Sequence, residues 1–277
     1  MSTRGPVATH RSSTGIPAGR LAVWWLLASE IFIFGGLIAC FVLFKLNGTP
    51  GFEDASETSV VAGAFNTFVL LTSSLTVVLA HAAVERGDRE KAFTYIWYTF
   101  AAGIVFLMVK VYEYSGKILS GHTITENLFW SFYYTMTGLH ALHVIGGMVV
   151  MALISFDVRK GYNYQRVELI GLYWHFVDLV WIFLFPLFYI ISTLGPMLEI
   201  PAITLITAFG IAVIKALMVA ANFMHLKFEK HIVWFLFIMS LTLLGVFFFG
   251  VAPDVMMTEG DQWIDCIADN SCVEQRL

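Results

Sequence analysis

Five ionisable side chains lie inside otherwise apolar stretches of this sequence. In GLYWHFVDLVWIFLFP, His175 and Asp178 are separated by one helical turn, and in TGLHALHVIGG the same spacing separates His140 from His143. Glu30 lies in a further apolar stretch near the N-terminus. Residues three apart share a helix face, so such groups could bind a metal ion, exchange protons, hold a lipid headgroup or hydrogen-bond a neighbouring helix.

The chemistry open to these side chains depends on their number and spacing. Bundles that hold two metal ions use Glu-x-x-His on two helices and a glutamate on each of two others. This sequence has no Glu-x-x-His, so we expect no metal site. An interhelical hydrogen bond is worth only about 0.6 kcal/mol, whereas an ionisable group at membrane depth costs about 3 kcal/mol. Structural hydrogen bonding, proton exchange and lipid-headgroup binding therefore remain open.

The elements that must position these groups are membrane helices. The chain is 58% apolar and only 13% charged, whereas about a quarter of the residues in a soluble domain are charged. A membrane crossing needs about 20 apolar residues, and no strand-like alternation is present. The sequence predicts an all-α, polytopic membrane helical bundle with seven transmembrane helices, at about 21–46, 59–84, 92–115, 127–156, 168–194, 200–221 and 232–252.

The distribution of Lys and Arg predicts the orientation of these spans. Basic residues gather in cytoplasmic loops, and the loops on the N-terminal side hold eleven of them, whereas the other side holds three. The N-terminus should therefore be inside and the C-terminus outside. The inner set is Arg4, Arg11, Arg20, Arg86, Arg89, Lys91, Arg159, Lys160, Arg166, Lys227 and Lys230, and the outer set is Lys45, Lys117 and Arg276.

Helical rise places the five buried ionisable groups at similar depths. Glu30, His175 and Asp178 come about 10–15 Å from the cytoplasmic end of their spans at 1.5 Å per residue. His140 and His143 come about 6–10 Å from the same boundary, on a hydrocarbon core about 30 Å thick. All five are therefore predicted to share the inner half of the bilayer.

A second ionisable pair, Lys110 and Glu113, lies near the outer end of the third span. Its spacing suits an ion pair between residues three apart on one helix. A lysine near a helix end can instead extend its ammonium to the interface, which is called snorkelling. Either arrangement would account for this pair.

The acidic C-terminal tail, residues 253–277, follows the last span on the predicted outer side. An oxidising compartment there permits a disulfide between Cys266 and Cys272. Six acidic residues against one arginine would attract a basic partner protein. The alternative is that the tail simply packs on a neighbouring subunit.

Five stretches taken together resemble subunit III of the haem–copper cytochrome oxidases, in its shorter five-span form. These stretches are SEIFIFGG (29–36), FNTFVLLTSSLTVVLAHAA (65–83), KVYEY (110–114), TGLHALHVIGG (137–147) and YWHFVDLVWIFLFPLFY (173–189). The resemblance implies a non-catalytic, multi-pass subunit of the bacterial inner membrane in aerobic respiration. It implies that the haem and copper are carried by partner subunits, that this chain contacts subunits I and II and bound phospholipid, and that it supports proton uptake. It implies no nucleic-acid partner.

A further stretch, KALMVAANFMHLKFEKH (215–231), resembles the small bacterial subunit IV. The chain is therefore expected to combine a subunit III-like five-helix domain (1–194), a subunit IV-like two-helix segment (195–252) and the acidic tail (253–277). The boundary falls in STLGPMLEIP, residues 192–201.

Three rival functions remain open at this point. A close relative of the five-span form accompanies nitric oxide reductases, and the motifs do not cleanly separate it from this chain. A quinol oxidase is also open, because the electron donor is chosen by subunit II. A stand-alone ion-coupled transporter would also keep buried His and Asp residues. Transporters of that kind usually have helices broken near the midplane, whereas Pro186 is the only proline deep inside a predicted span.

Overall fold

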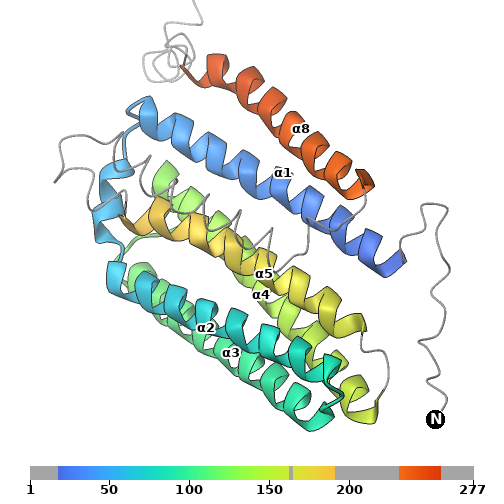
Figure 1. Cartoon of the computed structure of the whole chain (residues 1–277). Coiled ribbons are helices and arrows are strands. Elements are labelled where there is room, and N and C mark those ends of the chain that lie inside the picture. The colour runs from blue at the N-terminus through green and yellow to red at the C-terminus, as the bar shows by residue number, and fades with distance from the viewer. Residues whose placement is uncertain (1–17, 162–164, 191–230, 257–277) are drawn as a thin grey trace, which may run out of the picture.

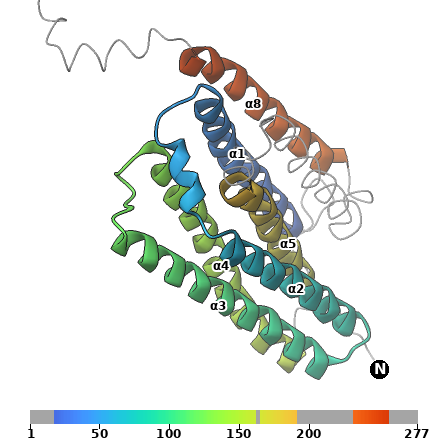
Figure 2. The same cartoon turned by 90° about the vertical axis from the view of Figure 1, so that its left-hand side faces the viewer.

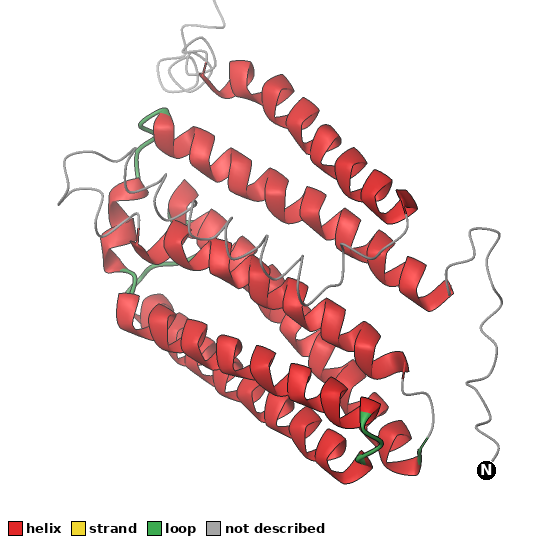
Figure 3. Cartoon of the chain, in the orientation of Figure 1, coloured by secondary structure: helices red, strands yellow, loops and turns green. Residues whose placement is uncertain are grey.

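The computed structural model describes residues 18–161, 165–190 and 231–256, and all of the regular structure in these ranges is helical (Figure 3). The elements are α1 (Ala18–Leu46), η1 (Phe52–Glu57), α2 (Val60–Glu85), α3 (Arg89–Leu119), α4 (Leu128–Lys160), α5 (Gln165–Phe185), η2 (Pro186–Ile190) and α8 (His231–Met256). η1 is a short 3-10 helix, and η2 is a π-helical continuation of α5 that starts at Pro186.

Five of these helices are long and apolar enough to cross a membrane, with lengths from 25 to 33 residues. They confirm the first five predicted spans and the all-helical, multi-pass class. The predicted sixth span, 200–221, lies outside the described residues. α8 covers the predicted seventh span but extends to Met256, so the first residues assigned to the tail, including Asp254, belong to this helix.

α5 lies at the centre of the bundle (Figures 1 and 2). It contacts α1, α2 and α4, while α2 pairs with α3, α3 with α4, and α8 with α1. Within the apolar window of α5, 67% of the residues are buried, compared with 28% for α2 and α3. The helix that carries His175 and Asp178 is therefore enclosed by its neighbours rather than facing lipid.

Small residues allow the helices to approach closely, as is common in membrane bundles. The Trp174 ring of α5 packs against Gly147 of α4 and Gly103 of α3, where an added Cβ would lie 3.0 and 3.3 Å from ring atoms. At the edge of the bundle, Gly35 of α1 receives Leu244 of α8, and an added Cβ would come within 2.6 Å of that side chain. These glycines therefore determine how closely α5 approaches α3 and α4, and how closely α8 approaches α1.

The helix ends follow ordinary capping chemistry. Ser59, Asp88 and Asn127 precede α2, α3 and α4, and each side chain accepts a hydrogen bond from the backbone N–H three residues later. Such caps satisfy N–H groups that the first helical turn leaves without partners. Gly161 ends α4 with φ 82°, a left-handed conformation that glycine adopts without a steric penalty.

Candidate functional site: buried ionisable groups between the helices

Glu30 and His143 meet between α1 and α4. The Glu30 Oε2 atom lies 3.1 Å from His143 Nε2, and Glu30 is only 7% exposed. His143 Nδ1 lies 2.8 Å from the Leu139 carbonyl oxygen, an acceptor that requires a proton on Nδ1. With Nδ1 directed at that carbonyl, Nε2 faces the Glu30 carboxylate, so two side chains that can each bind a proton lie side by side.

His140 occupies a different environment, although it lies only one turn before His143. Its ring is fully buried between Phe106 of α3 and Trp181 of α5, with centroid distances of 5.4 and 5.2 Å. Neither ring nitrogen has a hydrogen-bond partner among the described residues. The two histidines of HALH thus face different helices, His143 toward α1 and His140 toward α3 and α5.

His175 contacts α2, where its Nδ1 lies 2.8 Å from Ser74 Oγ. It belongs to a row of side-chain hydrogen bonds between α2 and α5, in which Trp174 and His175 pair with Ser73 and Ser74, and Trp181, about two turns further along α5, pairs with Thr67, about two turns earlier along α2. The indole N–H of Trp174 donates to Ser73 (2.9 Å), and that of Trp181 donates to Thr67 (3.0 Å). Two antiparallel helices held in this way cannot slide by one turn without losing every bond in the row.

Asp178 is buried on α5, at 4% exposure, one turn after His175. The sequence stretch that carries both residues therefore lies in the interior of the bundle, at the α2–α5 side, while Glu30 and His143 lie at the α1–α4 side. The described contacts distribute four of the five predicted residues over three environments: Glu30 with His143, His140 between two aromatic rings, and His175 against α2.

Lys110 and Glu113 form the most enclosed ionic site of the described chain. The three N–H donors of the Lys110 ammonium find three acceptors: Glu113 Oε2 at 2.9 Å, Tyr133 OH at 3.1 Å and Tyr189 OH at 2.8 Å. The Tyr189 hydroxyl donates in turn to Glu113 Oε1 at 2.8 Å. The Lys110 ammonium also lies 5.5 Å from the centroid of the Trp181 ring. These four polar residues, Lys110, Glu113, Tyr133 and Tyr189, are called the lysine network below.

The ion pair between residues three apart is present, but the snorkelling interpretation of Lys110 is wrong. Its side chain is 2% exposed and that of Glu113 3% exposed, so both point into the bundle. A buried ion pair is tolerated only when its remaining donors and acceptors are satisfied. The hydroxyl groups of the two tyrosines form these remaining hydrogen bonds. The sequence did not predict them as partners because they come from α4 and from η2, far away in the sequence.

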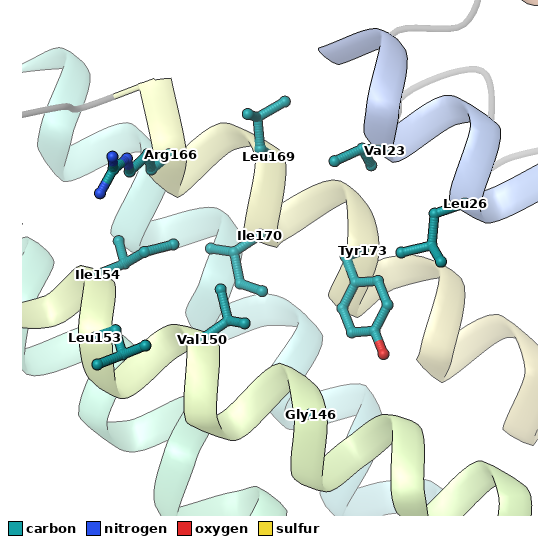
Figure 4. A pocket seen from close by; sticks show the side chains of 10 residues that line it. All are labelled: Val23, Leu26, Gly146, Val150, Leu153, Ile154, Arg166, Leu169, Ile170 and Tyr173. Atoms are coloured by element: carbon teal, nitrogen blue, oxygen red, sulfur yellow. The ribbon is translucent and has the colours of Figure 1, made fainter. Parts of the chain in front are cut away.

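A cavity of about 540 Å³ opens between α1, α4 and α5 (Figure 4). Its walls are mainly aliphatic, and Figure 4 shows Leu26, Val150 and Leu169 among the side chains around it. Arg166, at the start of α5, is the charged residue of the lining. Its Nη1 atom lies 2.7 Å from Asp157 Oδ2, so the guanidinium is held at the rim by the end of α4.

Comparison with known proteins identifies the family. The family described as "Cytochrome c oxidase subunit III" matches residues 9–193. A cytochrome c oxidase subunit 3 from Bacillus sp. (strain PS3) is 33% identical over 197 residues, which cover 69% of this chain and 94% of that protein. The corresponding protein of Thermostichus vulcanus is 36% identical over 171 residues, covering 60% of this chain and 84% of that protein. A heme-copper oxidase subunit I+III from Aeropyrum pernix is 28% identical over 183 residues, 62% of this chain and 22% of that protein.

The chain belongs to the cytochrome c oxidase subunit III family, as its motifs predicted. It is a multi-pass membrane protein and a non-catalytic subunit of an oxidoreductase complex. The predicted disulfide between Cys266 and Cys272 lies outside the described residues and stays a prediction, as does the sidedness of the chain.

Proposed function

We propose that this chain is an accessory subunit of a proton-pumping haem–copper terminal oxidase, and that it binds subunits I and II in the bacterial inner membrane. In this proposal the redox centres belong to the partner subunits, and this chain supports assembly, lipid binding and proton uptake. The electron donor is proposed to be cytochrome c. The observation that carries the role in proton uptake is the Glu30–His143 contact, because it places two side chains that can each bind a proton side by side between α1 and α4.

The proposed orientation is supported by the way basic residues gather at one end of the bundle. The α2–α3 turn lies beside the end of α4, since an added Cβ on Gly161 would come within 3.0 Å of the Arg89 guanidinium. Arg159 lies 5.2 Å from the centroid of the Phe93 ring in the same region. A basic end of this kind faces the cytoplasm, so the N-terminus is proposed to be inside and the C-terminus outside.

The proposed division of the chain is supported by the extent of the family match, which ends at residue 193, close to the predicted boundary at 194. The segment 195–252 is proposed to be subunit IV-like, and 253–277 to form an acidic outer tail. α8, the described part of that second segment, packs on α1, with the Phe247 and Phe32 rings 6.0 Å apart. This contact supports a fused segment that covers α1 within one protein.

Replacing Glu30 by Gln tests the role in proton uptake. An amide can still hydrogen-bond His143 but cannot exchange a proton, so the assembled oxidase should keep its haem content while proton uptake during turnover slows severalfold. The matched control is Glu90→Gln, at an exposed acid in the first turn of α3. Unchanged uptake kinetics in an intact Glu30→Gln complex would exclude the role in proton uptake.

Lipid binding is a second proposed role, and the cavity beside α1 supports it. Its aliphatic walls suit an acyl chain, and Arg166 at the rim suits a phosphate group, which arginine binds through paired N–H donors. Gly146 lines the same cavity, and an added Cβ there would meet only the Tyr173 hydroxyl, at 3.8 Å. Gly146→Leu should therefore fill the cavity without changing any charge.

Native mass spectrometry, which detects bound phospholipid, and the measurement of proton uptake together separate the two roles. Gly146→Leu should remove bound phospholipid and leave proton uptake unchanged, whereas Glu30→Gln should do the reverse. Equal phospholipid retention in the wild-type protein and Gly146→Leu would contradict the assignment of the cavity to a lipid.

A further inference from the structure

A second group of ionisable side chains lies at the opposite end of the bundle from the basic turns, between two connecting segments. Asp54 comes from η1, which joins α1 to α2, and His122 and Glu126 come from the connection between α3 and α4. One potential ligand atom from each of the three residues lies within 4.8 Å of the others. It is the only group of three such residues in the ranges that the structure describes.

Neighbouring side chains hold these ligands in place. Asp54 Oδ2 accepts hydrogen bonds from Asn127 Nδ2 at 2.6 Å and from the Trp130 indole N–H at 3.1 Å. The His122 ring stacks on Trp130 with a centroid distance of 4.7 Å and an interplanar angle of 21°. Residues that contact the ligands from behind in this way orient them toward a metal ion and raise the affinity of the site for that ion. His122 Nδ1 lies 3.1 Å from Glu126 Oε2.

We propose that Asp54, His122 and Glu126 bind a divalent transition-metal ion of the zinc class. One imidazole and two carboxylates are common ligands of Zn²⁺, whereas Ca²⁺ and Mg²⁺ prefer oxygen ligands alone. Tetrahedral ligands about 2.1 Å from Zn²⁺ are about 3.4 Å apart, and the ligand atoms of this group lie within 4.8 Å of one another, so the group need contract by at most about 1.4 Å. The Glu126 side chain is 36% exposed and that of His122 20%, so solvent can deliver the ion and Glu126 has room to move.

The bound ion would connect the two segments that join the helices at this end of the bundle. Asp54 is fixed on one segment and His122 with Glu126 on the other, and a water molecule would complete the coordination. None of these three residues takes part in the buried sites that carry the proposed function, so the two proposals stand independently. The sequence predicted no metal site, but Asp54 and His122 are distant in the sequence, and only the fold brings their two segments together.

The test is equilibrium binding of radioactive Zn²⁺ to the membrane complex purified through a tag on this chain, after treatment with a chelator. His122→Gln and Glu126→Gln should each weaken one zinc site at least tenfold. Asn127→Ser keeps a side chain that can cap α4 but removes the donor to Asp54, so it should weaken the same site by about 10- to 100-fold.

The matched control is His81→Gln. His81 and Glu85 also form an i,i+4 pair, with Nε2 and Oε1 3.6 Å apart, but no third ligand joins them in the described chain. This variant should bind zinc like the wild-type protein. Glu126→Gln alters an exposed connecting segment and should assemble normally, with an unchanged haem spectrum and melting temperature in the absence of zinc. Equal zinc affinity in the wild-type protein, His122→Gln and Glu126→Gln would overturn the proposal.

Discussion

The lysine network offers the sharpest test of how the bundle is held together. Replacing Glu113 by Gln removes the carboxylate that neutralises Lys110, whose side chain is 2% exposed. Removing one partner of a buried ion pair typically costs about 3–5 kcal/mol, because the remaining charge is left without compensation. Tyr189→Phe removes a hydroxyl that both accepts from Lys110 and donates to Glu113, and should cost about 1–3 kcal/mol.

The double variant Lys110→Met/Glu113→Leu distinguishes the loss of charge balance from a loss of packing. Apolar residues of similar volume often replace a buried ion pair without loss of stability, so the double variant should be more stable than Glu113→Gln alone. Stability would be followed by heating the purified complex and measuring the fraction that remains monodisperse. The control is Lys91→Met, which removes an exposed ion pair with Asp88 on the same helix and should cause no measurable change. A Glu113→Gln complex as stable as the wild-type protein, or a double variant no better than the single one, would refute this reasoning.

Three further results are expected of the assembled oxidase. Asp178→Asn and His175→Ala should leave electron transfer largely intact while shortening the period of sustained turnover, as measured by oxygen consumption; complete loss of activity in a haem-loaded complex would instead indicate direct chemistry. Ser74→Ala removes one hydrogen-bond partner of His175 and should reproduce the His175→Ala effect in weaker form; a wild-type result for Ser74→Ala alone would argue that this contact is not what His175 provides. Deleting residues 259–277 should raise the KM for cytochrome c at low salt and change it little at high salt, because exposed charges are screened over about 8–10 Å at physiological ionic strength; an unchanged low-salt KM would leave the tail as a packing element only.

Hydrophobic patterning was sufficient to predict the fold of residues 18–190. The length of each apolar run predicted its helix to within a few residues, because crossing the bilayer fixes a minimum length and the polar turns between runs are short. The predicted end of the fifth span, at residue 194, lies outside the described residues, and patterning did not show how the helix changes at Pro186. Pro186 interrupts the regular hydrogen-bond pattern, and the structure continues as a π-helix that turns Tyr189 toward Lys110.

The buried ionisable residues could be identified from the sequence, but their partners could not. The helical rise per residue predicted similar depths in the membrane for Glu30 and His143, and the structure brings them into contact. Depth does not determine which face of a helix a residue occupies, so it could not separate His140 from His143. Nor could it show that Tyr133 and Tyr189 would enclose Lys110, since that depends on how α3, α4 and η2 pack.

Purification of the intact complex through a tag on this chain tests the central claim most directly. The complex should contain a haem-bearing catalytic subunit and a copper-bearing subunit in equal amounts with this chain, identified by mass spectrometry and by the optical spectrum of the haem. The chain expressed without those partners should show no haem or copper absorbance. A chain that purifies from its native membrane with no haem-bearing partner, or that binds haem on its own, would contradict its role as an accessory subunit of a haem–copper oxidase.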